Sequence, residues 1–155
     1  SESHRKIAEA ISAMWKETLG IQVTVTNQEW KVYLKTIRTA DAPHIWRLGW
    51  CMDYPDANNW TREVFAKGGS ANPADGGGIN WENPVFEELV VKAAREMDPA
   101  KRMDLYAQAE QILVWEDAAM APIYWYTRVT CTKPYVNRTF SQHGHEMLEK
   151  WSLQP

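Results

Sequence analysis

The sequence predicts an α/β fold, and three observations support this class. Apolar residues recur at helical spacing from Ile7 to Leu19, and they alternate with polar residues from Ile21 to Val25. A second helical pattern then leads to a strand-like stretch at 45–50. Strand, helix and strand in this order favour a parallel pair of strands, because the helix supplies the crossover connection.

The boundaries of these first elements carry their own signals. Gly20 is a natural stop for the first helix, and Asn27 is a candidate N-cap for the second. The apolar face of this second helix is expected to consist of Trp30, Tyr33, Leu34 and Ile37. The turn-prone segment 53–56 should end the second strand, and a short helix is expected at about 58–66.

The middle of the chain changes in composition. Residues 67–80 hold five Gly, one Pro and two Asn, which predicts a surface loop. A phosphate cradle at Gly76-Gly77-Gly78 is not favoured, because no Lys-Ser/Thr pair follows and no strand precedes. Asn83-Pro84 and Asp98-Pro99 each predict the start of a helix. The core side of the second of these helices is expected to be Met103, Tyr106, Ala109, Ile112 and Leu113.

The C-terminal part reads first as a strand and then as an irregular segment. Residues 123–129 are rich in aromatic and β-branched residues, which favour a strand. Residues 133–155 are polar with isolated aromatics, and no partner for them is evident elsewhere in the sequence.

Composition excludes some classes of protein and leaves others open. With 155 residues, 45% hydrophobic and 24% charged, the chain suits one globular domain. A net charge of −3 with scattered Lys and Arg argues against nucleic-acid binding. No apolar run is long enough for a membrane-spanning helix, and the polar start at Ser1 implies that any export signal would lie upstream. The nine Trp residues suit either a binding surface or a Trp-rich core.

Cys51 and Cys131 are compatible with one disulfide, which their spacing neither supports nor excludes.

The densest functional signal lies between Arg47 and Asp56. Arg47 and Asp53 are separated by aromatic residues at the end of a predicted strand, where ligands of α/β proteins usually bind. A guanidinium can bind a carboxylate and the Asp carboxylate can accept from an ammonium, so the pair could hold a zwitterion. A simple ion pair at the strand end is the alternative.

Metal binding and catalysis have weaker support. His143, His145 and Glu146 could contribute to a metal site, but solvated histidines in a polar tail are favoured, and we expect neither metal nor cofactor. Cys51 and Ser70 are the candidate nucleophiles, and no Gly-x-Ser-x-Gly turn is present. The carboxylate pairs Glu87-Glu88 and Asp53/Asp56 could do acid–base work, but adjacent glutamates on a helix face are more often solvated. We therefore predict no catalytic residue.

Several stretches, taken in order, resemble the bacterial extracellular solute-binding proteins of family 5, which include oligopeptide- and dipeptide-binding receptors. The most distinctive is Gly49-Trp50-Cys51-Met52-Asp53-Tyr54-Pro55-Asp56, which is similar to the Gly-Trp-x-x-Asp-Tyr strand end of that family. The other similar stretches are 7–21, 27–34, 84–89, 102–111, 121–126 and 133–136.

The resemblance implies a periplasmic-binding-protein type II-like lobe, a mixed sheet flanked by helices, that is incomplete because the chain is a C-terminal portion. Residues 1–127 would belong to the second ligand-binding lobe, and residues 128–155 would cross back to the first. The role implied is the solute-binding component of an ABC importer, which binds peptides between two lobes outside the cytoplasmic membrane and delivers them to a membrane permease. Unpaired strand edges in such a fragment would favour a homodimer.

The resemblance also assigns roles to five residues. Asp53 matches the aspartate that holds the α-ammonium of a bound peptide, and Arg47 aligns with an arginine that can receive its carboxylate. Arg38 occupies the place of another cleft arginine, while Trp50 and Cys51 match positions that line the cleft. The alternatives are a sugar, a nickel complex or another non-peptide ligand in the same family, and a hydrolase is a more distant one.

Overall fold

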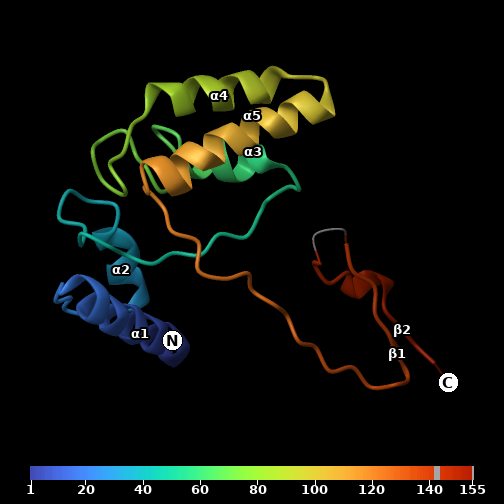
Figure 1. The fold of residues 1–155 in the computed structure, drawn as a ribbon. Coiled ribbons are helices and arrows are strands. Elements are labelled where there is room, and N and C mark those ends of the chain that lie inside the picture. The colour runs from blue at the N-terminus through green and yellow to red at the C-terminus, as the bar shows by residue number, and fades with distance from the viewer. Residues whose placement is uncertain (142–143, 155) are drawn as a thin grey trace. The chain divides into compact units, whose positions relative to one another are not determined.

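The structure is a computed structural model that describes residues 1–141 and 144–154. It divides into two compact units, residues 1–37 and residues 38–155. The first unit holds helices α1 (Glu2–Leu19) and α2 (Trp30–Thr36). The second holds all other elements, among them the three labelled helices α3, α4 and α5 (Figure 1).

In the first unit, α1 ends as the sequence predicts. Gly20 adopts the left-handed conformation with φ of 69°, and its N–H donates to the carbonyl of Lys16 at 3.1 Å. The predicted cap of α2 was wrong by two positions. The carboxylate of Glu29, not Asn27, accepts from the N–H groups of Lys31 and Val32 at 2.9 and 3.3 Å. A capping side chain must directly precede the first helical residue, and that residue here is Trp30.

The second unit begins its helical part with α3 (Ala57–Trp60), which continues into the π-helical turn η1 (Thr61–Phe65). Helix α4 (Pro84–Arg95) and helix α5 (Pro99–Gln111) follow, and α5 continues into a second π-helical turn, η2 (Ile112–Glu116). Asn83 and Asp98 cap α4 and α5 as predicted, each with a proline in the first turn.

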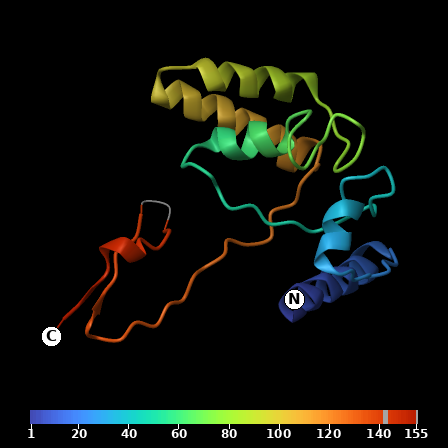
Figure 2. The same ribbon diagram turned by 180° about the vertical axis from the view of Figure 1, so that it is seen from behind.

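Helices α4 and α5 lie side by side in opposite directions, and α3 lies against them (Figures 1 and 2). Their contact forms the hydrophobic core of this unit, with Phe86, Val90 and Ala109 fully buried. The other buried members of the core are Ala66, Ile112 and Leu113. The predicted inner face of α5 is confirmed except for Met103, whose side chain is 62% exposed.

The predicted loop at 67–80 is confirmed, and one of its glycines allows close backbone packing. A Cβ atom on Gly77 would lie 2.0 Å from the carbonyl oxygen of Arg38, which is a severe clash. Only glycine lets these two backbone segments approach so closely.

The predicted strands at 21–25, 45–50 and 123–129 were wrong for this structure, because no regular strand is assigned to these residues. The predicted parallel βαβ pair is therefore absent from residues 1–141 and 144–154. A strand requires a neighbour that pairs with its backbone N–H and C=O groups. Apolar side chains in these segments are accordingly exposed, for example 66% at Ile45 and 88% at Val129.

The C-terminal segment contains more structure than the sequence suggested. Strand β1 (Val136–Asn137) pairs antiparallel with β2 (Ser152–Leu153), and the 3-10 turn η3 (Leu148–Lys150) precedes β2. Between the strands, the guanidinium of Arg138 pairs with Glu146. It also lies over the rings of Phe140 and Trp151 at 4.9 and 4.8 Å, so this segment packs on itself.

No helix in the described part of the chain is long and apolar enough to cross a membrane.

Candidate ligand-binding site

The loop that carries the predicted binding residues runs directly into α3, and Asp56 fixes this junction. Its Oδ1 accepts from the N–H of Asn58 at 2.8 Å, which caps the helix. The same carboxylate pairs with Arg102 of α5, whose Nη2 lies 2.8 Å from Oδ1. The N-terminus of α3 is therefore attached to α5.

Burial alone would raise the pKa of Asp56. The hydrogen bond from Arg102, the N–H of Asn58 and the charge of Arg102 outweigh this effect and hold the pKa below its usual value. The carboxylate is therefore charged at neutral pH, as its ion pair and helix cap both require.

Asn59 on α3 is fully buried, and its side chain forms hydrogen bonds back to the preceding loop. Its Oδ1 accepts from the indole Nε1 of Trp50 at 2.9 Å and from the backbone N–H of Asp53 at 3.0 Å. Its Nδ2 donates to Asp53 Oδ2 at 3.1 Å and to Glu63 Oε2 at 2.8 Å. Both acceptor positions and both donor hydrogens of the amide are thus used.

Glu63 is held in turn by a second pair of side chains. The Tyr54 hydroxyl donates to Glu63 Oε1 at 2.6 Å, and it accepts from Asn58 Nδ2 at the same distance. Burial, and next its hydrogen bond to the Glu63 carboxylate, raise the pKa of Tyr54, so the hydroxyl stays protonated and donates. One hydrogen-bonded cluster within residues 50–63 therefore connects Trp50, Asp53, Tyr54, Asn58, Asn59 and Glu63.

Asp53 itself is exposed, whereas Trp50 is half-buried. The structure thus brings two of the predicted binding residues together through Asn59. A carboxylate accessible to solvent beside an aromatic ring is suited to binding a cationic group with an apolar neighbour.

Arg47 is positioned by a different part of the chain. Its Nη2 donates to the hydroxyl of Tyr126, and its guanidinium lies 5.9 Å from the centre of that ring. Tyr126 also packs on Tyr124 at 4.8 Å between ring centres. The segments around 47 and 126 therefore meet through side chains, although neither forms a strand.

A further aromatic contact joins α3 to the same segment. The rings of Trp60 and Trp125 meet edge to face with their centres 5.9 Å apart. Trp125 is nevertheless 83% exposed. Aromatic surface from 124–126 thus lies beside both Arg47 and the helix that carries Asn59.

The remaining predicted residues are less closely tied to Asp53. Arg38 is exposed, and its backbone carbonyl packs against Gly77. Cys51 is an exposed free thiol, and so is Cys131, so the disulfide left open by the sequence is not formed.

Asn59, Glu63 and Tyr126 were not predicted from the sequence. Asn59 holds Asp53 and Trp50, Tyr126 holds Arg47, and Glu63 acts one step further out by holding Asn59. Their residue types give no functional signal by themselves. One clue was available for Asn59, which lies three residues after the turn-forming Asp56. In the first turn of a helix a side chain tilts toward the N-terminus, which here is the side of the loop.

The carboxylate pairs considered for catalysis have structural contacts. Glu87 accepts from the N–H of Lys67 at 2.8 Å, and Glu88 pairs with Lys92 at 3.4 Å. No cluster of metal-binding side chains occurs among residues 1–141 and 144–154. His143, named in the metal hypothesis, lies outside the described residues.

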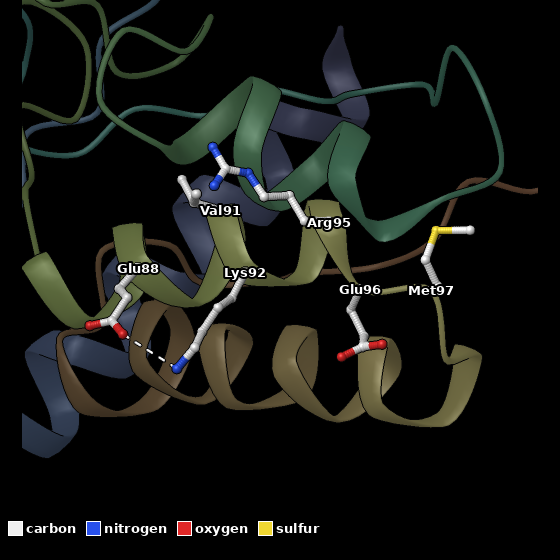
Figure 3. A pocket seen from close by; sticks show the side chains of 6 residues that line it. All are labelled: Glu88, Val91, Lys92, Arg95, Glu96 and Met97. Atoms are coloured by element: carbon white, nitrogen blue, oxygen red, sulfur yellow. Dashed lines mark hydrogen bonds and ion pairs between the residues drawn. The ribbon is translucent and has the colours of Figure 1, made fainter.

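A surface depression of about 350 Å³ lies elsewhere, along α4 (Figure 3). Its lining comes from α4 and the two residues that follow, and Glu88 and Lys92 in it are paired with each other. None of the five predicted binding residues lines it. We therefore place the candidate site at the cluster within residues 50–63 and at Arg47, and not in this depression.

Comparison with a solved structure shows the class of protein to which the chain is similar. The chain superposes with a TM-score of 0.72 on the structure of "MppA Periplasmic Murein Tripeptide Binding Protein, Unliganded Open Form", at 34% identity. The likeness covers 88% of this chain and 25% of MppA. This likeness gives the class of the chain, a solute-binding protein. It is also consistent with the chain forming part of a type II binding-protein lobe.

The sequence comparisons then give the family. Residues 1–72 match the family described as "Bacterial extracellular solute-binding proteins, family 5 Middle". The oligopeptide-binding protein OppA of Bacillus subtilis is 39% identical over 126 residues, 81% of this chain and 22% of OppA. The periplasmic OppA of Salmonella typhimurium is 35% identical over 136 residues, 88% of this chain and 24% of that protein. The chain belongs to the family 5 solute-binding proteins, and it spans about a quarter of the length of these relatives.

Proposed function

We propose that this chain contributes one side of the ligand cleft of a peptide receptor that serves an ABC importer. In this proposal, residues 1–127 belong to the second lobe and residues 128–155 cross back to the first. The complete receptor would bind peptides between its lobes on the outer face of the cytoplasmic membrane and deliver them to a permease. It would bind its ligand without chemical conversion. A homodimer has no support in the comparisons and is not part of the proposal.

The observation that carries the proposal is the exposed carboxylate of Asp53, held by buried Asn59 beside Trp50. A carboxylate fixed in this way can accept hydrogen bonds from the α-ammonium of a peptide. Arg47, held by Tyr126, supplies a cation for the carboxylate at the other end of a short peptide. Solute-binding relatives named for oligopeptides and for a murein tripeptide agree with a ligand of this kind.

The test is calorimetric titration of the intact protein with a pool of di- to pentapeptides, with oligosaccharides and a nickel complex as parallel ligands. Peptide binding that is lost when the peptide amino terminus is acetylated would support the proposal. Binding to a sugar or a nickel complex alone would keep the receptor class and reject the peptide ligand. Hydrolysis of the peptides, measured in the same samples by mass spectrometry, would reject the non-enzymatic function.

A further inference from the structure

Asn59 combines complete burial with complete use of its hydrogen-bonding groups. Its side chain is fully buried, and all four of its hydrogen-bonding positions are used. The partners are Trp50, Asp53 at two atoms, and Glu63. A buried amide with four partners has one fixed orientation, because a flip would turn its NH2 group toward the two N–H donors.

This fixed amide determines the geometry of the two residues on the exposed side. One bond holds the indole of Trp50, and two bonds hold the backbone and the carboxylate of Asp53. Among the described residues, the hydrogen bonds to the Asp53 carboxylate involve Oδ2 only. Oδ1 is thus available to a ligand, while the rotation of the carboxylate is restricted.

We propose that Asn59 is the positioning residue of this binding site, which orients Asp53 and Trp50 for the ammonium of a peptide. This inference rests on the proposed function. Asp53 is exposed, so without Asn59 its carboxylate would sample several rotamers, and ligand binding would have to select one of them. A carboxylate held in place before binding avoids that loss of conformational entropy.

Glu63 fixes the amide orientation of Asn59 from the other side. Glu63 Oε2 accepts from Asn59, while Oε1 accepts from Tyr54. A carboxylate can accept at both oxygens, whereas a glutamine would present an NH2 group to one of these donors. Glu63→Gln therefore leaves a single carbonyl oxygen for which Asn59 and Tyr54 compete, and it does so at an exposed position, where the risk to folding is small.

The chain offers a matched control for loss of a buried amide. Asn72 is also fully buried, and its Nδ2 donates to the carbonyls of Phe65 and Trp81 at 3.0 and 2.6 Å. These partners flank the loop at 67–80 on either side, and the hydrogen bonds of the Asn72 side chain do not involve Trp50 or Asp53. Asn72→Ser should lower stability as Asn59→Ser does, and it should leave the orientation of Asp53 unchanged.

The experiment measures the ratio of affinities of the intact protein for a free tripeptide and for its N-acetylated form. A high ratio for the unmodified protein tests the proposed function itself. We expect Asn59→Ser to reduce this ratio by about tenfold or more, the scale of one hydrogen bond to a charged group. Glu63→Gln should reduce it in the same direction, and Asn72→Ser should not change it.

A second measurement needs no ligand. The indole N–H signal of Trp50, identified by its absence in Trp50→Phe, should shift in the NMR spectrum of Asn59→Ser and stay in place in Asn72→Ser. An unshifted signal overturns the inference, whether or not peptides bind. An unchanged affinity ratio in both Asn59→Ser and Glu63→Gln overturns it as well. If the unmodified protein does not distinguish the two tripeptides, the proposed function fails, and the ammonium role of Asn59 fails with it.

Discussion

The guanidinium of Arg102 and the carboxylate of Asp56 lie 2.8 Å apart and join α5 to the N-terminus of α3. The guanidinium also lies 5.1 Å from the ring centre of Tyr106 and donates to the carbonyl of Ala93 on α4. One cation therefore contacts three helices. Because α3 also carries Asn59, this joint supports the candidate site as well as the fold.

Asp56→Asn should lower the free energy of unfolding by about 1 kcal/mol. Asparagine can still cap α3, so the change removes mainly the charge of the ion pair, which is partly exposed to solvent. Chemical denaturation monitored by circular dichroism measures the loss. Asp98→Asn is the matched control, because Asp98 caps α5 without an ion pair among the described residues. Equal effects of the two substitutions would contradict a stabilising role for the Arg102 pair.

The same pair predicts a dependence of stability on pH. The pKa of Asp56 is lowered in the folded protein, so its stabilising contribution is present above the ordinary pKa of about 4 and is lost as the pH falls through the lowered value. The destabilising effect of Asp56→Asn should therefore shrink as the pH falls from 6 to about 3. Thermal unfolding of both proteins across this range checks it. An effect that grows with acidity has the wrong sign.

Much of the helical part of the fold could be predicted because its signals are local. Asn83-Pro84, Asp98-Pro99 and Gly20 each define a helix end through neighbouring backbone groups. The strands could not be predicted reliably in the same way. The alternation at 45–50 indicates that the side chains suit a sheet. A strand also needs a second strand, distant in the sequence, that pairs with its backbone.

In the site, too, features encoded by neighbouring residues were predicted, whereas contacts between distant residues were not. Asp53 and Trp50 were found from the residues around them, and the structure brings both to one amide, Asn59. The partner of Arg47 is 79 residues away, at Tyr126, and no local pattern contains that contact. Residue types thus indicated which groups could bind a ligand, whereas folding decides what orients them.

Gly77→Ala should destabilise the loop at 67–80 strongly. The new Cβ would meet the backbone of Arg38 at 2.0 Å, and backbone cannot move aside as a flexible side chain can. We expect a loss of about 3 kcal/mol in denaturant unfolding, near the upper range for overpacking. Gly68→Ala is the control, since its Cβ meets nothing within 4 Å and bears only the strain of φ +86°. The predicted packing would be refuted by a smaller loss at Gly77 than at Gly68.

Asp53→Asn should weaken peptide binding by about 2–5 kcal/mol in the intact protein, because a desolvated charge pair with the peptide ammonium is broken. Calorimetry with a free tripeptide measures the change. Asp104→Asn, on an exposed position of α5, controls for the altered net charge. Unchanged affinity in Asp53→Asn would remove this residue from the binding site.

Arg47 should act on the opposite end of the ligand, so its substitution should have a different signature. Arg47→Gln removes the cation but keeps a hydrogen-bonding side chain, and it should weaken binding of free-acid tripeptides by about 2 kcal/mol or more. Binding of the corresponding C-terminal amides should change little, because they lack the carboxylate.

Tyr126→Phe should give a weaker version of the same pattern, since it removes the hydroxyl that accepts from Arg47 and leaves the charge in place. Titration of each variant with an acid and amide pair separates these effects. An equal loss for acid and amide in Arg47→Gln would indicate that Arg47 only supports the segment at 124–126, and the carboxylate role would then be rejected.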